Sequence, residues 1–112
     1  GTVATSTPES EADYKTGSLS FGSISGSGGS FTQLAAAPSN PYKFVTPSNL
    51  TDVDMDFSFD GGSTVHVNML AGAVQDFPFK GHEIKESSAI HVRATGATAP
   101  ARGKCVSNGF TA

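Results

Sequence analysis

The sequence predicts an all-β protein, an antiparallel β-sandwich of about eight strands, jelly-roll-like, with an extended N-terminal arm. Three observations predict this class. Polar and apolar residues alternate strictly from Asp52 to Phe59, as they do on the two faces of a half-buried strand. The 112 residues include 13 Gly and 6 Pro, and these turn-forming residues recur roughly every 8 to 12 positions, the spacing typical of a sandwich. No window repeats its apolar residues with the 3.6-residue period of a helix.

The clearest element is a β-hairpin. Two alternating runs, residues 53–59 and 65–70, flank the turn Asp60-Gly61-Gly62-Ser63, and glycine tolerates the positive φ that such a reversal requires. Because alternate side chains share a face, one face of the hairpin should enter the core. These residues are Val53, Met55, Phe57, Phe59, Val65, Val67 and Met69. The opposite face carries Asp52, Asp54 and Asp56, which should meet solvent or a partner.

The remaining strands are shorter and less regular. Leu19, Phe21 and Ile24 indicate a first strand, residues 31–36 a second and residues 42–46 a third, which Pro47 should limit or bend. After the hairpin, Ala71-Gly72 forms a second reversal. Strands are then expected at 74–79, where Pro78 suggests an edge or a bulge, at 88–94 and at 104–110, with connections at 80–86 and 96–103. Periodicity does not fix the strand order.

The first 16 residues differ in texture from the rest. They are polar and poor in core residues, so we expect an extended arm at 1–16 and one sandwich domain at 17–112. Such an arm gains order where a partner binds it. The residues that could anchor it on a neighbouring subunit are Val3, Glu9, Glu11, Asp13 and Tyr14.

Composition argues against several classes of function. The formal charge of −3 and the lack of a Lys/Arg cluster argue against nucleic-acid binding, which needs a basic surface. No apolar run approaches the roughly 20 residues of a membrane span. The N-terminus lacks the pattern of a signal peptide, and the single Cys105 cannot form an intrachain disulfide. We therefore expect assembly in a cytoplasm, and we give little weight to the sequon Asn49-Leu50-Thr51.

The candidate chemical groups predict neither an enzyme nor a metal or cofactor site. The carboxylates of Asp52, Asp54 and Asp56 could attract Ca²⁺, but alternate positions on a strand lie about 6.8 Å apart, too far for all three to hold one ion. The histidines lack metal-ligand spacing; they are His66, His82 and His91. Cys105 adjoins Lys104 but has no evident His partner, and no serine lies in a GxSxG motif.

One segment carries a resemblance to a known group of proteins. The run NLTDVDMDFSFDGGSTVHVNMLAGAVQDF resembles the succession of turns and alternating strands in small virion proteins of tailed bacteriophages. The flanking runs GSISGSGGSFTQLAAA and APARGKCV are similar to the strands and loops of that pattern. The resemblance covers residues 17–110. Pro47, Pro78 and the final NGF depart from the pattern.

The resemblance implies a structural protein of the virion that decorates and stabilises the capsid shell. It would bind the major capsid protein through many modest contacts, so that avidity substitutes for the affinity of a single site. The implied assembly is a homo-oligomer, with a trimer favoured, on the capsid exterior. Three alternatives stay open: a neck, tail or fibre-base component, a carbohydrate-binding adhesive sandwich, and an unrecognised hydrolase.

Overall fold

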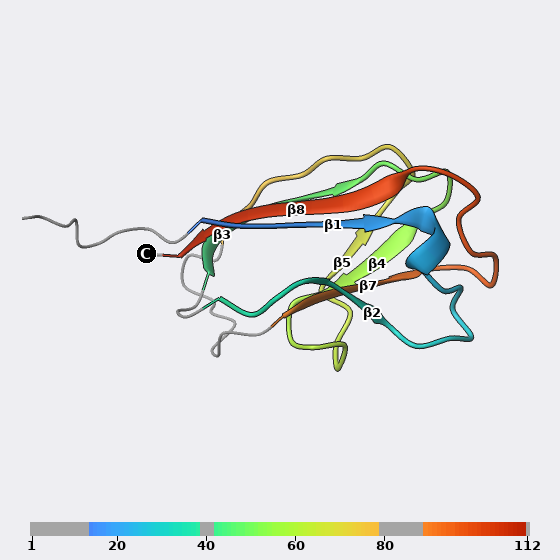
Figure 1. Ribbon diagram of the computed structural model, residues 1–112, viewed down its shortest axis with the longest axis horizontal. Coiled ribbons are helices and arrows are strands. Elements are labelled where there is room, and N and C mark those ends of the chain that lie inside the picture. Colours follow the sequence, from blue (N-terminus) through green and yellow to red (C-terminus); the bar gives the residue numbers. More distant parts are fainter. Residues whose placement is uncertain (1–13, 39–41, 79–88, 112) are drawn as a thin grey trace, which may run out of the picture.

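The computed structural model describes residues 14–38, 42–78 and 89–111. Two four-stranded antiparallel sheets pack face to face as separate layers (Figure 1). Sheet A contains, in spatial order, β1 (Tyr14–Ser20), β8 (Lys104–Thr111), β3 (Tyr42–Asn49) and β6 (Phe77–Pro78). Sheet B contains β2 (Thr32–Ala35), β7 (Ile90–Ala94), β4 (Met55–Ser58) and β5 (Val67–Met69). The only helical element within these ranges is a 3-10 turn, η1 (Phe21–Ser23).

The strand order is that of a jelly roll. In the order β1-β8-β3-β6 over β2-β7-β4-β5, strand 1 pairs with 8, 2 with 7, 3 with 6 and 4 with 5. All these pairs are antiparallel, as they are when one long hairpin is rolled into two sheets. The predicted fold class is confirmed, and the structure supplies the strand order that periodicity left open.

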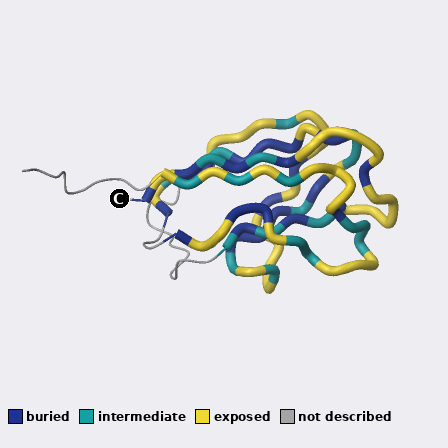
Figure 2. Tube along the Cα trace, viewed as in Figure 1, coloured by how far each residue is buried: buried dark blue, intermediate teal, exposed yellow. Residues whose placement is uncertain are grey.

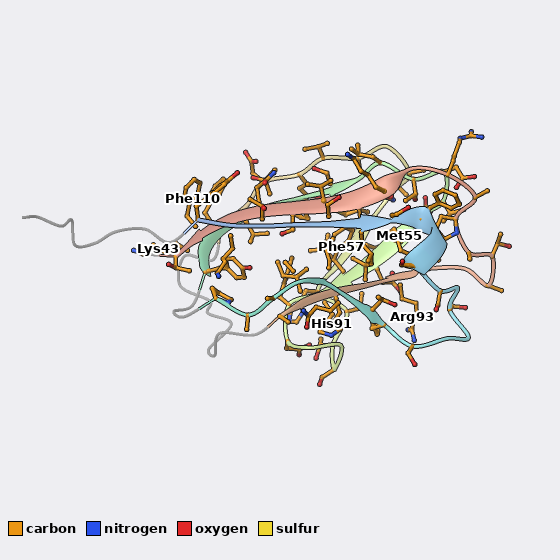
Figure 3. All side chains as sticks on the ribbon, in the orientation of Figure 1. Lys43, Met55, Phe57, His91, Arg93 and Phe110 are labelled. Carbon is orange, nitrogen blue, oxygen red and sulfur yellow. The ribbon has the colours of Figure 1, made fainter. Side chains whose placement is uncertain are left out.

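The hairpin contributes the largest side chains of the core, as predicted. Met55, Phe57 and Phe59 are almost completely buried, and so are Val67 and Met69. Met55 and Phe57 lie between the two layers in Figure 3. Figure 2 shows buried segments in both layers. Val53 is half-buried and packs against the edge of this cluster. The buried apolar residues that surround the hairpin side chains are Ile24, Leu34, Ala35, Tyr42, Val45, Ile90, Val92, Ala94 and Cys105.

The prediction for Val65 is wrong, because this side chain is 45% exposed. Phe57 pairs with Val67, so the connection between the strands runs from residue 59 to residue 66 and is longer than a tight turn. Gly61 and Gly62 both have positive φ, at 82° and 100°. Strand alternation does not apply within the connection, so the position of Val65 in the pattern does not bury it.

Pro47 lies within β3 and does not end it. The backbone oxygen of Pro47 accepts a hydrogen bond from Gln75, on the side of β3 that faces away from β8. The missing N–H of Pro47 therefore also points away from β8, and the ladder with β8 continues to Asn49. The expectation that Pro47 limits the strand is corrected, whereas β6, which contains Pro78, does lie at an edge of sheet A.

The first strand begins and ends earlier than the apolar pattern indicates. β1 starts at Tyr14, so residues 14–16 pair with β8 and belong to the sheet instead of the expected arm. It ends at Ser20, and Phe21 begins η1. The outer face of β1 carries the small polar side chains of Thr16, Ser18 and Ser20, which leave no apolar alternation to read. Residues 1–13 lie outside the described part of the chain.

Candidate interaction surfaces

Each of the three acidic residues accepts hydrogen bonds from a different part of the chain. Asp52 and Asp54 accept from backbone N–H groups, and Asp56 accepts from two side chains. The Oδ1 atom of Asp52 accepts the N–H of Ala101 at 2.9 Å, in the connection between β7 and β8. The Oδ1 atom of Asp54 accepts the N–H of Ala71 at 3.1 Å, in the turn after β5. These two carboxylates therefore fasten the β3–β4 connection to two other loops.

Asp56 joins two neighbouring strands by a polar network. Its Oδ1 atom accepts hydrogen bonds from the side chains of Asn68, at 3.0 Å, and Thr95, at 2.8 Å. Asn68 also donates to the hydroxyl of Thr95 at 2.7 Å. Within the described ranges, no group of three or more His, Cys, Asp or Glu residues is arranged to hold a metal ion.

The hydrogen bond from Ala101 also has an electrostatic effect. It lowers the pKa of the Asp52 carboxyl below its usual value, with a smaller contribution from the positive charge of Arg102. These contacts within the chain therefore favour the ionised form of the Asp52 carboxyl. A role for Asp52, Asp54 and Asp56 in binding a partner stays a prediction.

Asn49 forms a second fastening point, at the end of β3. Its side-chain nitrogen donates to the backbone oxygens of Val53, Met69 and Leu70 at 2.9 to 3.1 Å. Its Oδ1 atom accepts the N–H and the hydroxyl of Thr51. Because Asn49 is completely buried and its amide is engaged in this way, the sequon residue is not accessible for glycosylation in the folded protein.

An apolar surface surrounds this fastening point. Leu50, Leu70 and Val74 are all exposed, and Leu70 is 62% exposed. Asn49 brings their backbones together, because Leu70 accepts from its amide and Ala73 accepts from its backbone N–H. Val74 pairs with Ser48, immediately before Asn49 in β3. We call Leu50, Leu70 and Val74 the apolar corner. The sequence does not predict this surface, because it does not distinguish an exposed Leu or Val in a loop from a buried one.

A second exposed surface lies at the other end of sheet A, on its outer face. Tyr14 of β1, Phe110 of β8 and Phe44 of β3 are cross-strand neighbours in the register. Tyr14 is 54% exposed and Phe110 45% exposed, and their ring centroids lie 4.9 Å apart. Phe110 projects outward from sheet A in Figure 3, opposite His91 and Arg93 on the far side of sheet B. We call Tyr14, Phe110 and Phe44 the aromatic shelf.

A row of polar side chains adjoins the aromatic shelf on the same face. The row crosses β1, β8 and β3 two residues along each strand from the shelf. Asn108 of β8 pairs with Thr16 of β1 on one side and with Thr46 of β3 on the other. The hydroxyl of Tyr14 donates to Oδ1 of Asn108 at 3.2 Å. The hydroxyl of Thr46 donates to Oδ1 of Asp76 at 3.1 Å. We call Thr16, Asn108, Thr46 and Asp76 the polar row.

The other sequence-predicted groups are divided between the core, the surface and the undescribed residues. Cys105 is fully buried, and burial raises the pKa of its thiol from 9.0 to about 12, which does not suit a nucleophile. His66 uses its Nδ1 atom to accept the N–H of Phe59 at 3.1 Å. Tyr14 lies on the aromatic shelf, but Val3, Glu9, Glu11, Asp13 and His82 lie outside the described residues.

The fold and these surfaces define a jelly-roll domain with two exposed apolar areas at opposite ends. Comparison with protein-family models, with curated proteins and with solved structures finds no match to this chain. Within the described ranges, no helix has the length and apolar character needed to cross a membrane.

Proposed function

We propose that the protein is a structural component of a phage virion that decorates and stabilises the capsid shell by binding the major capsid protein through the apolar corner. The jelly-roll strand order supports this role, because viral capsid proteins are among the main users of the fold. Lectin domains and cupins use it too, so the fold alone does not decide the function. The sequence resemblance over residues 17–110 favours the virion among these uses.

The observation that carries the proposal is the rigid support beneath the exposed side chains of the apolar corner. Asn49 holds the carbonyls of Met69 and Leu70, and Asp54 holds the N–H of Ala71. Leu70 is thus presented on a turn that is fastened from two sides. Exposed apolar side chains on a backbone that is already ordered lose little conformational entropy on binding, which favours a protein contact.

Many copies of the contact together make a small contact area sufficient for stable attachment to the capsid. Three exposed aliphatic side chains offer too little area for a stable interface by themselves, since stable pairs bury about 800 Å² on each partner. A trimer on a capsid engages several equivalent contacts together, and its avidity exceeds the affinity of each contact. The proposed assembly is therefore a homo-oligomer, with a trimer favoured, on the outer surface of the shell.

The experiment measures binding to capsids that lack the protein, purified after deletion of its gene. Leu70→Asp places a charge in the centre of the apolar corner and should weaken binding at least tenfold. Val65→Asp, which alters an equally apolar exposed position in the connection between β4 and β5, should bind as the unaltered protein does. Equal binding by both variants would exclude the apolar corner as the contact.

Location in the intact virion tests the competing assignment to the neck, tail or fibre base. Gold-labelled antibody against the protein should decorate the capsid shell evenly in electron micrographs. Label confined to the neck or the tail would contradict the decoration role and support the alternative. Copy number determined from virion mass gives the same answer independently, because a decoration protein is present at many copies per shell.

A further inference from the structure

We propose that the aromatic shelf and the polar row together form a binding site for a neutral saccharide. The site lies on the outer face of sheet A, at the end away from the apolar corner, so the proposal does not depend on capsid binding. It rests on three features of the described residues: two exposed rings in contact, hydrogen-bonding groups beside them, and a lack of net charge at the outer-face positions.

The two rings supply an apolar surface of the appropriate kind. The rings of Tyr14 and Phe110 lie side by side with their planes inclined at 42° and their centroids 4.9 Å apart. The C–H groups on one face of a sugar ring are weakly positive and apolar, so they pack well against the electron-rich face of an aromatic ring. Phe44, half-buried next to Phe110, extends the same surface to β3.

The polar row supplies donors and acceptors for sugar hydroxyls. It lies about 6.8 Å from the rings along the strands, the rise of two residues. Because Oδ1 of Asn108 accepts from Tyr14, the amide N–H groups of Asn108 point elsewhere, and they have no partner within the described residues. Asp76 accepts from Thr46 through one oxygen and keeps the second as an acceptor.

The charges around the site favour a neutral ligand. Among the described outer-face positions of sheet A, Asp76 lies in the polar row and Lys104 lies at the far end of β8, next to Ser20. Lys15 alternates with the exposed positions of β1, and Lys43 lies in the bulge between Tyr42 and Phe44. Within the described ranges no cation forms an ion pair with the Asp76 carboxylate, so this carboxylate would repel an acidic polysaccharide, whereas a neutral sugar can hydrogen-bond to it.

Affinity electrophoresis in native gels tests the site directly. Gels that contain dextran, mannan, amylopectin or galactan provide neutral probes, and an alginate gel provides an acidic one. We expect at least one neutral polysaccharide to retard the full-length protein. Tyr14→Ala and Phe110→Ala should each weaken this retardation at least tenfold, measured as the polysaccharide concentration required for half the effect.

Matched variants distinguish loss of sugar stacking on the aromatic shelf from loss of the folded structure. Phe21→Ala removes an exposed aromatic side chain outside the shelf and should leave retardation unchanged. Tyr14→Phe keeps the ring but loses the hydrogen bond to Asn108, so it should give an intermediate effect. Melting temperatures of all variants show that the fold is kept.

Three outcomes would overturn the proposal. They are a lack of retardation in every neutral gel, retardation in alginate alone, and equal retardation of the unaltered protein and the Tyr14→Ala and Phe110→Ala variants. Capsid binding of the same two variants distinguishes the two proposals. Loss of capsid binding without any saccharide binding would assign the shelf to a protein partner, whereas normal capsid binding leaves the proposed function intact.

Discussion

The side-chain amide of Asn49 donates a hydrogen bond to the backbone oxygen of Met69 at 3.0 Å. Asn49 is the last residue of β3 in sheet A, and Met69 is the last residue of β5 in sheet B. A single buried amide therefore connects the two sheets where both strands end. The same amide also holds Val53 and Leu70, so one side chain fixes the start of two loops.

Replacement of Asn49 by Ala should destabilise the protein by about 3 kcal/mol. The substitution leaves several buried backbone groups without partners, and the cost of an unsatisfied buried group is about 1–3 kcal/mol. Asn68→Ala provides the control, because Asn68 is exposed and should cost less than about 1 kcal/mol. Urea unfolding of the two variants measures the difference, and similar losses would contradict the central role of Asn49.

Phe57→Ala should cost about 3–5 kcal/mol, whereas Val65→Ala should stay within about 0.5 kcal/mol. Phe57 is fully buried between the sheets, and Val65 is exposed in the connection between β4 and β5. Both residues belong to the same alternating apolar pattern in the sequence, but only Phe57 is buried. Comparison of the two variants therefore shows whether burial or the sequence pattern determines the loss of stability. Equal free energies of unfolding for the two variants would show that the register of the hairpin differs from the one described.

Gly17→Ala should destabilise the sandwich by about 2 kcal/mol or more, as overpacking commonly does. A Cβ atom at position 17 would overlap the backbone oxygen of Leu34 and lie 2.8 Å from the Cβ of Ala35, where β1 passes close to β2. Gly22→Ala is the control, since a Cβ there meets nothing within 4 Å. Thermal unfolding should show a lower melting temperature for the first variant alone.

The thiol of Cys105 should not react with Ellman's reagent at pH 8 while the protein is folded. Burial raises its pKa to about 12, so the reactive thiolate is scarce and the sulfur has no access to solvent. One equivalent should react rapidly in guanidinium chloride. Rapid reaction of the folded protein would place Cys105 in an exposed position, against the structure.

Stability should fall between about pH 4 and pH 2 partly through Asp60. Burial alone would raise the pKa of this carboxyl, but hydrogen bonds from Ser58 and Thr64 outweigh it and lower the pKa from 3.8 to about 2. A carboxyl whose pKa is lower in the folded state than in the unfolded state stabilises the fold at any pH above its unfolded-state pKa. This stabilisation is lost as the pH falls to the folded-state pKa.

Allowing for solvent screening, the contribution of Asp60 should be about 1 kcal/mol. Asp60→Asn removes the titrating group, so its unfolding free energy should depend less steeply on pH between 4 and 2. Parallel urea curves across this range measure the slope for the variant and the unaltered protein. Identical slopes would show that the carboxyl of Asp60 has the same pKa in both states.

The strongly alternating parts of the chain were predictable, because a strand with one buried face places every second side chain in the core. This rule located Met55, Phe57, Phe59, Val67 and Met69 correctly, and the Gly and Pro spacing indicated a sandwich. The rule failed at Val65, which lies in the connection before β5 begins. It also missed residues 14–16, because Tyr14 and Thr16 lie on the exposed face of β1 and form no alternating apolar pattern.

The candidate sites could be predicted only in part. Tyr14 was expected to contact a partner, but its neighbours Phe110 and Phe44 lie far from it in the sequence and meet it only through the pairing of β1, β8 and β3. The charges of Asp52, Asp54 and Asp56 were evident, whereas their backbone partners depend on how the loops pack. Alternation and turn residues are local properties, so the sequence by itself determined the β class and the face of each regular strand. The strand order, the fastening by Asn49 and both exposed surfaces were decided by the tertiary structure, because each depends on contacts between residues distant in the chain.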